Sequence, residues 1–443
     1  MKPNTPDEQS GSAASFVTPL VELAKTAPLD FLLGLGVALL PIFHLTVKSW
    51  TNGWLAFLTV VSLMVLIHEI RNGNGLFEDW KTKAVFACLA APLLGIGIAQ
   101  LARKQLFWNA LDGPSRMACA AVVFLALKKR RIPFVGAFRW CCSLSILVCL
   151  FSILAFKTGI HAWGGRFATY FVDCDTFGQH VTLLTFLSFM MVQMDETPRP
   201  VQLALDCAAV LGGAYLVLGS QTRGAWIAVG PLSIVWLLAV RRAPLRILMT
   251  SLAGVFALLI VLTLKHESYN RVLSIYQELS QWFSGHNRET SAGIRITMWN
   301  MSWALFQNSP AFGYGEYEDY KYLLDNTWIA SVSTDQAKEA VRHGPHNQVA
   351  AEALRSGFLG ILYSIGYFAI PAIVFLRGLF SASRRLQKSA ALGFCVVVAF
   401  AVFSLSMEVF SLKFAASFFG FLIAAFSAEC LTQSGKVQTP LQT

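Results

Sequence analysis

The sequence predicts an all-α, polytopic membrane protein, and its composition and apolar pattern carry that prediction. Of the 443 residues, 55% are hydrophobic and only 14% are charged, and the mean hydropathy is +0.55. A soluble domain carries about a quarter charged residues. Apolar runs of about twenty residues, long enough for a membrane-spanning helix, recur from end to end. These runs are continuous rather than alternating, which argues against a β-barrel.

About twelve apolar runs can be read along the chain as membrane spans. The fourth run is short and carries Arg116. An even number of spans places both ends of the chain on the same side of the membrane. The predicted spans are 29–47, 53–70, 83–102, 113–128, 134–156, 177–194, 201–219, 223–240, 245–264, 348–376, 388–407 and 411–429.

Basic residues in the connections between the runs assign the two sides. One set of connections is rich in lysine and arginine, and the opposite set of short loops is poorer in them. The positive-inside rule makes the rich set cytoplasmic. That set contains Lys81, Lys83, Lys128, Lys129, Arg130, Arg131, Arg241, Arg242, Arg246, Arg384, Arg385 and Lys388.

This topology predicts five segments. Residues 1–28 form a cytoplasmic N-terminal tail, in which the absence of a hydrophobic stretch argues against a cleavable signal peptide. Residues 29–264 hold transmembrane helices 1–9, and residues 265–347 form a long outward-facing loop with short helices. Residues 348–430 hold helices 10–12, and residues 431–443 form a cytoplasmic C-terminal tail.

Several function classes lose support from the sequence. The formal net charge of +10 is spread over short loops, which is a topology pattern rather than a nucleic-acid footprint. The nine cysteines lack metal-ligand spacing and most lie within apolar runs as small hydrophobic residues. Neither a P-loop, a zinc-protease motif nor a nucleophile elbow is present. We therefore expect no metal and no cofactor.

The long loop has the composition of a folded segment. It is about eighty residues long, and long ordered loops are uncommon unless they serve a function. Ile296, Trp299, Trp303 and Phe306 recur at helical spacing, which predicts an amphipathic or membrane-rim helix over 295–307. Asn308-Ser309-Pro310 should end that helix, and residues 335–343 predict a second short helix.

Arginines at the outward rims of the spans are candidate anion ligands. Arg223 lies in a short turn, SQTRGAW, where Ser220, Thr222 and the first N–H groups of the following helix could bind the same anion. Arg295 is expected to open the loop helix, where its charge opposes the helix dipole unless an anion lies there. The alternatives are an interface arginine for Arg223 and solvated loop arginines for Arg295 and Arg166.

Two histidines precede the tenth predicted span, in RHGPHNQ at 342–348. A neutral histidine is the commonest general base in enzymes, although a lone interface histidine is usually structural. Spacing alone does not choose between His343 and His346. Arginines that hold a diphosphate leaving group, beside a base that deprotonates an attacking alcohol, predict chemistry on a lipid diphosphate without ATP.

These motifs resemble those of bacterial O-antigen ligases, within the wider group that includes O-antigen polymerases and oligosaccharide-to-pilin ligases. The matching stretches are SQTRGAW, the run from Arg295 to the GYG at 313–315, and HGPHNQVAAEALRSGFLG with Gly357 and Gly360. GGRFATYF, which contains Arg166, is a weaker match. The resemblance covers about residues 160–380 by motif and the rest by architecture, and it implies a fold like that of C-type glycosyltransferases.

The resemblance implies transfer of a polysaccharide from undecaprenyl diphosphate to the lipid A-core, completing lipopolysaccharide at the periplasmic face of the bacterial inner membrane. His346 matches the family's proposed general base, and Arg223 and Arg295 match its diphosphate-binding arginines. Expected partners are the lipid-linked donor, the lipid A-core acceptor and membrane lipids, and nucleic acid is not expected. The further possible substrate contacts are Arg166, His343, Arg342, Trp299 and Asn347.

One departure and three rival functions accompany this interpretation. Many relatives carry a glutamate two residues before Gly357, whereas this chain has Arg355 there and Glu352 one turn earlier. The rivals in the same reaction class are an O-antigen polymerase and a ligase with a protein acceptor. A transporter of lipid-linked sugars is less consistent, because the candidate residues gather on one side rather than at the membrane midplane.

Overall fold

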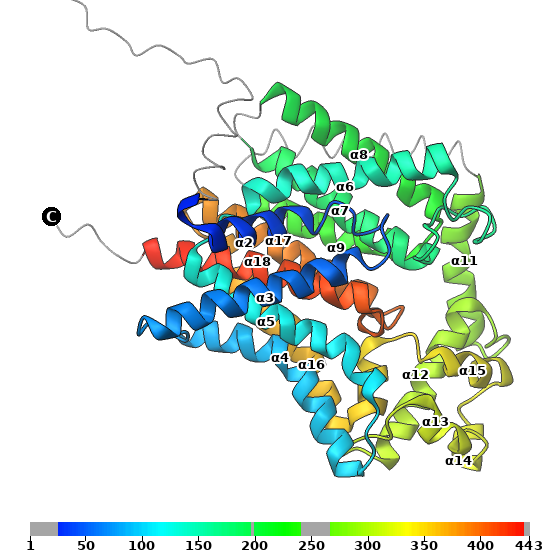
Figure 1. The fold of residues 1–443 in the computed structure, drawn as a ribbon. Helices are drawn as coiled ribbons and strands as arrows, with labels where there is room; N and C mark the ends of the chain where they lie inside the picture. The colour runs from blue at the N-terminus through cyan, green and yellow to red at the C-terminus, as the bar shows by residue number, and fades with distance from the viewer. Residues whose placement is uncertain (1–24, 196–198, 241–265, 438–443) are drawn as a thin grey trace, which may run out of the picture.

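The computed structural model describes residues 25–195, 199–240 and 266–437, and within these ranges every regular element is a helix (Figure 1). Most of the helices run alongside one another in a bundle. The bundle contains α2 (Pro28–Leu39), α3 (Trp50–Arg71), α4 (Trp80–Arg103), η1 (Trp108–Leu111), α5 (Asp112–Arg130), α6 (Val135–Phe156), α7 (Cys174–Met194), α8 (Pro200–Ser220), α9 (Arg223–Val240), α16 (Gln348–Leu379), α17 (Arg384–Phe403), η4 (Val409–Ser411) and α18 (Lys413–Val437).

The all-α polytopic prediction is confirmed. In the described part of the chain, nine helices are long and apolar enough to cross a membrane, and each coincides with a predicted span. The short fourth span is one of them, as Trp108–Arg130. It accommodates Arg116 through an ion pair of 2.8 Å with Asp112, one helical turn away.

Three predicted spans are not among these nine helices. The run 29–47 is helical only to Leu39 and continues as turns, because Pro41 has no N–H to extend the helix. The run 177–194 forms α7, which is not among the nine because polar residues such as Gln179 and His180 lower its hydropathy. The run 245–264 lies outside the described residues. The total of about twelve spans remains a prediction.

The centre of the bundle is α18. In the most apolar 18-residue stretch of Lys413–Ser434, 94% of the residues are buried inside the protein. A helix that is apolar on all sides belongs in an interior, and α18 packs against α5, α16 and α17. Gly420 allows the close approach to α5, since a Cβ there would lie 2.9 Å from that of Ala120.

Residues 266–347 lie at one end of the bundle and have a small core of their own (Figure 1). Leu354 of α16 joins this core, so the segment packs directly on a bundle helix. Its helices are α11 (His266–Phe283), α12 (Ser291–Asn308), α13 (Tyr317–Tyr320), η2 (Lys321–Leu323), α14 (Thr327–Ala330), α15 (Asp335–Ala340) and η3 (Val341–His343). The core consists of Met298, Met301, Leu305, Tyr320, Leu324, Ile329, Ala337, Val341 and Leu354.

The helix predicted over 295–307 is present within α12. In its tryptophan stripe Trp303 is 58% exposed and Trp299 is half-buried, whereas Met298 and Met301 are buried. The helix is apolar on most sides, and its methionine stripe is the one that meets α15 and α16. Because α12 begins at Ser291, Arg295 lies in its second turn rather than at its start.

A kink in α16 joins the bundle to the long loop. At Gly357 the backbone has φ 61° and ψ −138°, which interrupts the helical hydrogen bonds. The freed groups pair with the loop: Phe358 N donates to Pro310 O at 2.7 Å, and Tyr314 N donates to Leu354 O at 2.7 Å. The loop is therefore bonded to α16 about ten residues after His346.

Candidate functional site

His346 lies in a tight turn directly before α16. Its φ is 50°, a left-handed conformation that is uncommon for residues other than glycine. Gly344, with φ 93°, and Pro345 precede it. The Asn347 side chain caps α16 by accepting a hydrogen bond from Ala350 N at 3.1 Å. Strained residues of this kind cluster at functional sites, so the turn holds the half-buried His346 ring in place.

The surroundings of His346 favour its neutral form. Burial lowers the pKa of His346 below its ordinary value of 6.5, and the Arg295 cation lowers it further, while the Asp175 carboxylate raises it. Arg295 comes from α12 and Asp175 from the first turn of α7. Charges from two distant segments thus act on this ring, and a neutral imidazole near pH 7 can accept a proton.

Arg166 lies on the same side of the bundle and is held by three acceptors. Its guanidinium donates to Asp175 Oδ1 at 2.7 Å, to Ser220 O at 2.8 Å and to Thr222 Oγ1 at 3.3 Å. The first of these partners is the carboxylate whose charge acts on His346. Arg166 therefore belongs to the His346 neighbourhood.

Arg223 and Arg295 are linked through a carboxylate in the long loop. Arg223 Nη1 lies 2.8 Å from Glu278 Oε1. The other oxygen of Glu278 accepts from Ala292 N at 2.9 Å, in the first turn of the helix that carries Arg295. Arg295 Nη1 donates to Ser291 Oγ at 2.9 Å, while its buried Nε has no partner among the described residues.

Ser220 and Thr222 do not act as the predicted anion donors. Ser220 Oγ donates to Val217 O at 2.8 Å, and Thr222 Oγ1 donates to Cys174 O at 2.7 Å. Both residues are buried. The Ser220 hydroxyl is used within α8, and the Thr222 hydroxyl attaches the turn before α9 to the start of α7. The two side chains position Arg223 rather than face an anion.

The remaining candidate contacts differ in exposure and in their partners. Arg342 and His343 are exposed on η3, and Arg342 lies 3.8 Å from Glu339. Asn347 is used as the helix cap of α16. Trp299 is half-buried, and its indole N–H has no hydrogen-bond partner in the described ranges.

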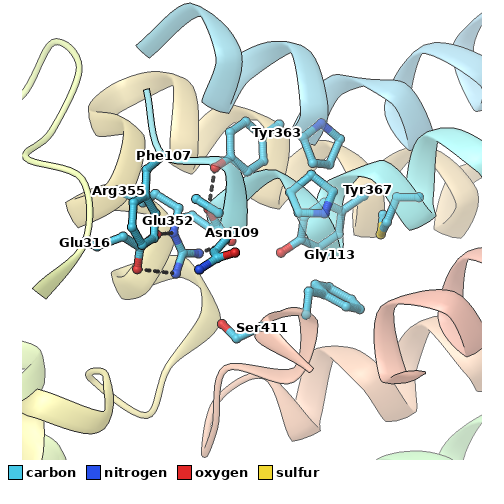
Figure 2. A pocket seen from close by; sticks show the side chains of 14 residues that line it. Phe107, Asn109, Gly113, Glu316, Glu352, Arg355, Tyr363, Tyr367 and Ser411 are labelled. Atoms are coloured by element: carbon cyan, nitrogen blue, oxygen red, sulfur yellow. Dashed lines mark hydrogen bonds and ion pairs between the residues drawn. The ribbon is translucent and has the colours of Figure 1, made fainter. Parts of the chain in front are cut away.

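A second cluster of charges surrounds Arg355, at the position where many relatives have a glutamate (Figure 2). Arg355 lies 2.7 Å from Glu316 and 3.0 Å from Glu352. Glu352 also accepts from Gln348 at 2.8 Å and from the Tyr363 hydroxyl. Because Glu316 belongs to the long loop, this network is a further attachment of the loop to α16.

This second cluster lines a cavity of about 190 Å³ between α4, α5 and α16. Its one arginine is opposed by two carboxylates, so the cavity offers no free positive charge to a diphosphate. Around His346, by contrast, three arginines lie near the carboxylates of Asp175 and Glu278, and a third acidic residue, Glu408, packs against the His346 turn. The arginines therefore gather on the His346 side. The labelled cavity walls in Figure 2 include Phe107, Asn109, Gly113, Glu316, Glu352, Arg355, Tyr363, Tyr367 and Ser411.

Glu408 lies between the two clusters. It precedes η4, and its carboxylate occupies the space that a side chain at Gly344 would need. Its second oxygen accepts from Ser411 Oγ at 3.1 Å. Burial raises the pKa of Glu408 to about 7, although the Arg355 cation opposes this. The carboxylate thus packs against the turn that carries His346.

Sequence reasoning missed the acidic members of this site. Glu278 is 55 residues from Arg223, and Glu408 follows an apolar run with no recognisable spacing to His346. Asp175 is in the loop noted around Arg166, but nothing in the sequence pairs the two. Only the fold brings these carboxylates to the cations.

The pH dependence of kcat/KM in variants of Arg295 and Asp175 would test whether both charges act on His346. If neutral His346 is required for activity, the acid limb of kcat/KM should lie below pH 6.5. Arg295→Gln removes a cation that disfavours imidazolium, so the limb should move to higher pH. Asp175→Asn removes a carboxylate that favours imidazolium, so the limb should move to lower pH. Shifts in the same direction, or an equal shift in Arg288→Gln, would contradict the placement.

Comparison with known proteins extends these observations. Residues 208–365 match a family model described as O-antigen ligase. Over this range the chain is similar to the O-antigen ligase family. The matched range runs from α8 to the first part of α16 and contains Arg223, Glu278, Arg295 and His346, while Arg166 and Glu408 lie outside it.

A curated relative agrees with the family match. An O-antigen ligase of Salmonella typhimurium (strain LT2) is 28% identical to this chain over 184 residues. The alignment covers 40% of this chain and 41% of the relative, so it spans less than half of either protein.

Proposed function

We propose that this protein is a glycosyltransferase of the inner membrane that completes lipopolysaccharide. It takes a polysaccharide from undecaprenyl diphosphate and joins it to the lipid A-core oligosaccharide, with inversion and without ATP or metal. The observation that carries the proposal is the neighbourhood of His346, where the charges of Arg295 and Asp175 act on one imidazole. A base and anion-binding cations are the groups that this reaction requires.

The proposed chemistry follows from that neighbourhood. An acceptor sugar hydroxyl attacks the anomeric carbon of the first donor sugar while His346 takes the hydroxyl proton. The bond from that carbon to the diphosphate oxygen breaks, and the undecaprenyl diphosphate leaves with the electron pair. Arg223 and Arg295 stabilise the negative charge that develops on the leaving group. Attack opposite the leaving group inverts the anomeric carbon.

The location of the reaction rests on the distribution of basic residues. Lys81, Lys128 and Arg384 lie at connections opposite to the long loop in the predicted topology. The positive-inside rule therefore supports a periplasmic position for residues 266–347 and for His346.

Reconstitution tests the proposed reaction directly. The purified chain in liposomes receives lipid-linked polysaccharide and lipid A-core, with EDTA and without ATP, and the joined product is measured. Elongation of the lipid-linked chain without joining would indicate a polymerase, and transfer only to an added pilin would indicate a protein ligase. Movement of the donor across the bilayer without any new glycosidic bond would indicate a transporter.

The diphosphate role of Arg223 makes a separate prediction. Arg223→Gln should raise the KM for the lipid-linked donor about tenfold or more, since hydrogen bonds to charged groups contribute about 1.5–3 kcal/mol. The KM for the acceptor should change little. Arg288→Gln is the matched control, because Arg288 is an exposed loop arginine near the Trp282 ring. An unchanged donor KM in Arg223→Gln would exclude this role.

A further inference from the structure

A second cavity lies far from the His346 neighbourhood. It has a volume of about 400 Å³ and lies between the start of α4, the second half of α16, the start of α17 and the end of α18. Arg377 in its wall comes 20 residues after the kink at Gly357, which corresponds to roughly 30 Å along the helix. The lining residues are Trp80, Lys81, Ala84, Ile370, Ile373, Val374, Arg377, Gly378, Ser381, Leu386, Leu431 and Ser434.

The charge of this groove is positive. Lys81 and Arg377 are its charged residues, and within the described ranges neither forms an ion pair with a carboxylate. Arg377 instead lies over the Trp80 ring, 5.6 Å from its centroid. The acidic residues nearest in sequence, Glu78 and Asp79, are paired with lysines of α5, at 2.9 Å for Lys128 and Asp79. Two cations therefore remain uncompensated.

The rest of the groove is mostly apolar, apart from Ser381 and Ser434, and it lies at the ends of membrane-spanning helices. Ile370, Ile373 and Val374 come from α16, and Leu386 and Leu431 complete the wall. Ile373 is 49% exposed and Trp80 is 60% exposed. Tryptophan at the end of a span is typical of the membrane interface, and basic pockets between spans on the cytoplasmic side suit lipid headgroups.

We propose that this groove binds an anionic phospholipid. Lys81 and Arg377 bind its phosphate, and an acyl chain lies along the isoleucine and leucine wall. The apolar wall and the position at the span ends favour a lipid over a soluble phosphate. By the predicted topology this is the cytoplasmic end, so the lipid comes from the cytoplasmic leaflet. The inference does not depend on the proposed transferase function.

Native mass spectrometry of the full chain in detergent tests this site. Phosphatidylglycerol is the anionic probe, and phosphatidylethanolamine is the zwitterionic comparison. The double variant Lys81→Gln/Arg377→Gln should lose roughly thirtyfold in phosphatidylglycerol affinity, about fivefold for each cation at a membrane surface. Ala84→Trp keeps both charges but fills the groove, and it should also lose affinity.

The control is Arg71→Gln/Lys83→Gln, which removes two exposed cations at the same end but outside the groove. This control should retain the wild-type affinity and preference. Equal losses in the control and the double variant would indicate general surface attraction and overturn the site. Displacement of the lipid by glycerol phosphate, with Ala84→Trp binding normally, would indicate a free phosphate site and also overturn it. Circular dichroism confirms that each variant is folded.

Discussion

Replacing His346 with asparagine is expected to lower the rate of polysaccharide transfer by about 10²- to 10⁴-fold, the contribution typical of a general base. Asparagine tolerates the left-handed conformation that residue 346 adopts, so the turn should persist. It has no group that accepts a proton near pH 7. The loss should appear in kcat, while the donor KM changes little because the arginines remain. The reconstituted liposome reaction provides the measurement.

Two further histidine variants decide whether this effect is specific. His343→Asn should reduce the rate less than about tenfold, because His343 is exposed on η3. His286→Asn, in an exposed turn of the same loop, should leave the rate unchanged. The residual activity of His346→Asn should also lack the acid limb of the wild-type pH profile. A wild-type rate in His346→Asn, or a larger loss in His343→Asn, would move the base away from His346.

The fold was largely predictable because hydrophobic run length is a strong signal in membrane proteins. The prediction was weakest where a proline or polar residues interrupt an apolar run. Pro41 ends α2 early, and the polar residues of α7 lower its hydropathy although the helix is present. The sequence predicted a helix over 295–307 but did not show which face of α12 packs on the rest of the loop. When a helix is apolar on most sides, its neighbours choose the packed face, and the sequence of the helix alone does not.

The candidate site was predictable only in part. Arg223 and Arg295 stand out by residue type and position, whereas only the family resemblance selects His346 over His343. Their acidic partners come from segments that no local pattern connects to them. The carboxylate expected before Gly357 illustrates the limit. Arg355 takes that position, and it is bonded to Glu352 from one turn earlier and to Glu316 from the long loop.

Gly357→Ala is expected to cause the largest loss of stability, about 3 kcal/mol or more. Its backbone, with φ 61° and ψ −138°, is in a region that L-residues rarely occupy. An added Cβ would also lie 2.5 Å from Pro310 O and 2.6 Å from the carbonyl carbon of Ala311. These are backbone atoms of the long loop, so the clash cannot be relieved by a side-chain rotation.

The consequence should reach the candidate site. If the added Cβ displaces the loop at Pro310, the hydrogen bond from Phe358 N to Pro310 O breaks. Pro310 lies just after α12, the helix that carries Arg295, so that helix loses an attachment to α16. Gly357→Ala should therefore lower both the midpoint of thermal unfolding in detergent and the transferase rate. Gly366→Ala in the same helix is the control, because nothing lies within 4 Å of the added Cβ. Equal unfolding midpoints for Gly357→Ala and Gly366→Ala would show that the kink is not what fastens the loop, since helical glycine-to-alanine changes are neutral or mildly stabilising.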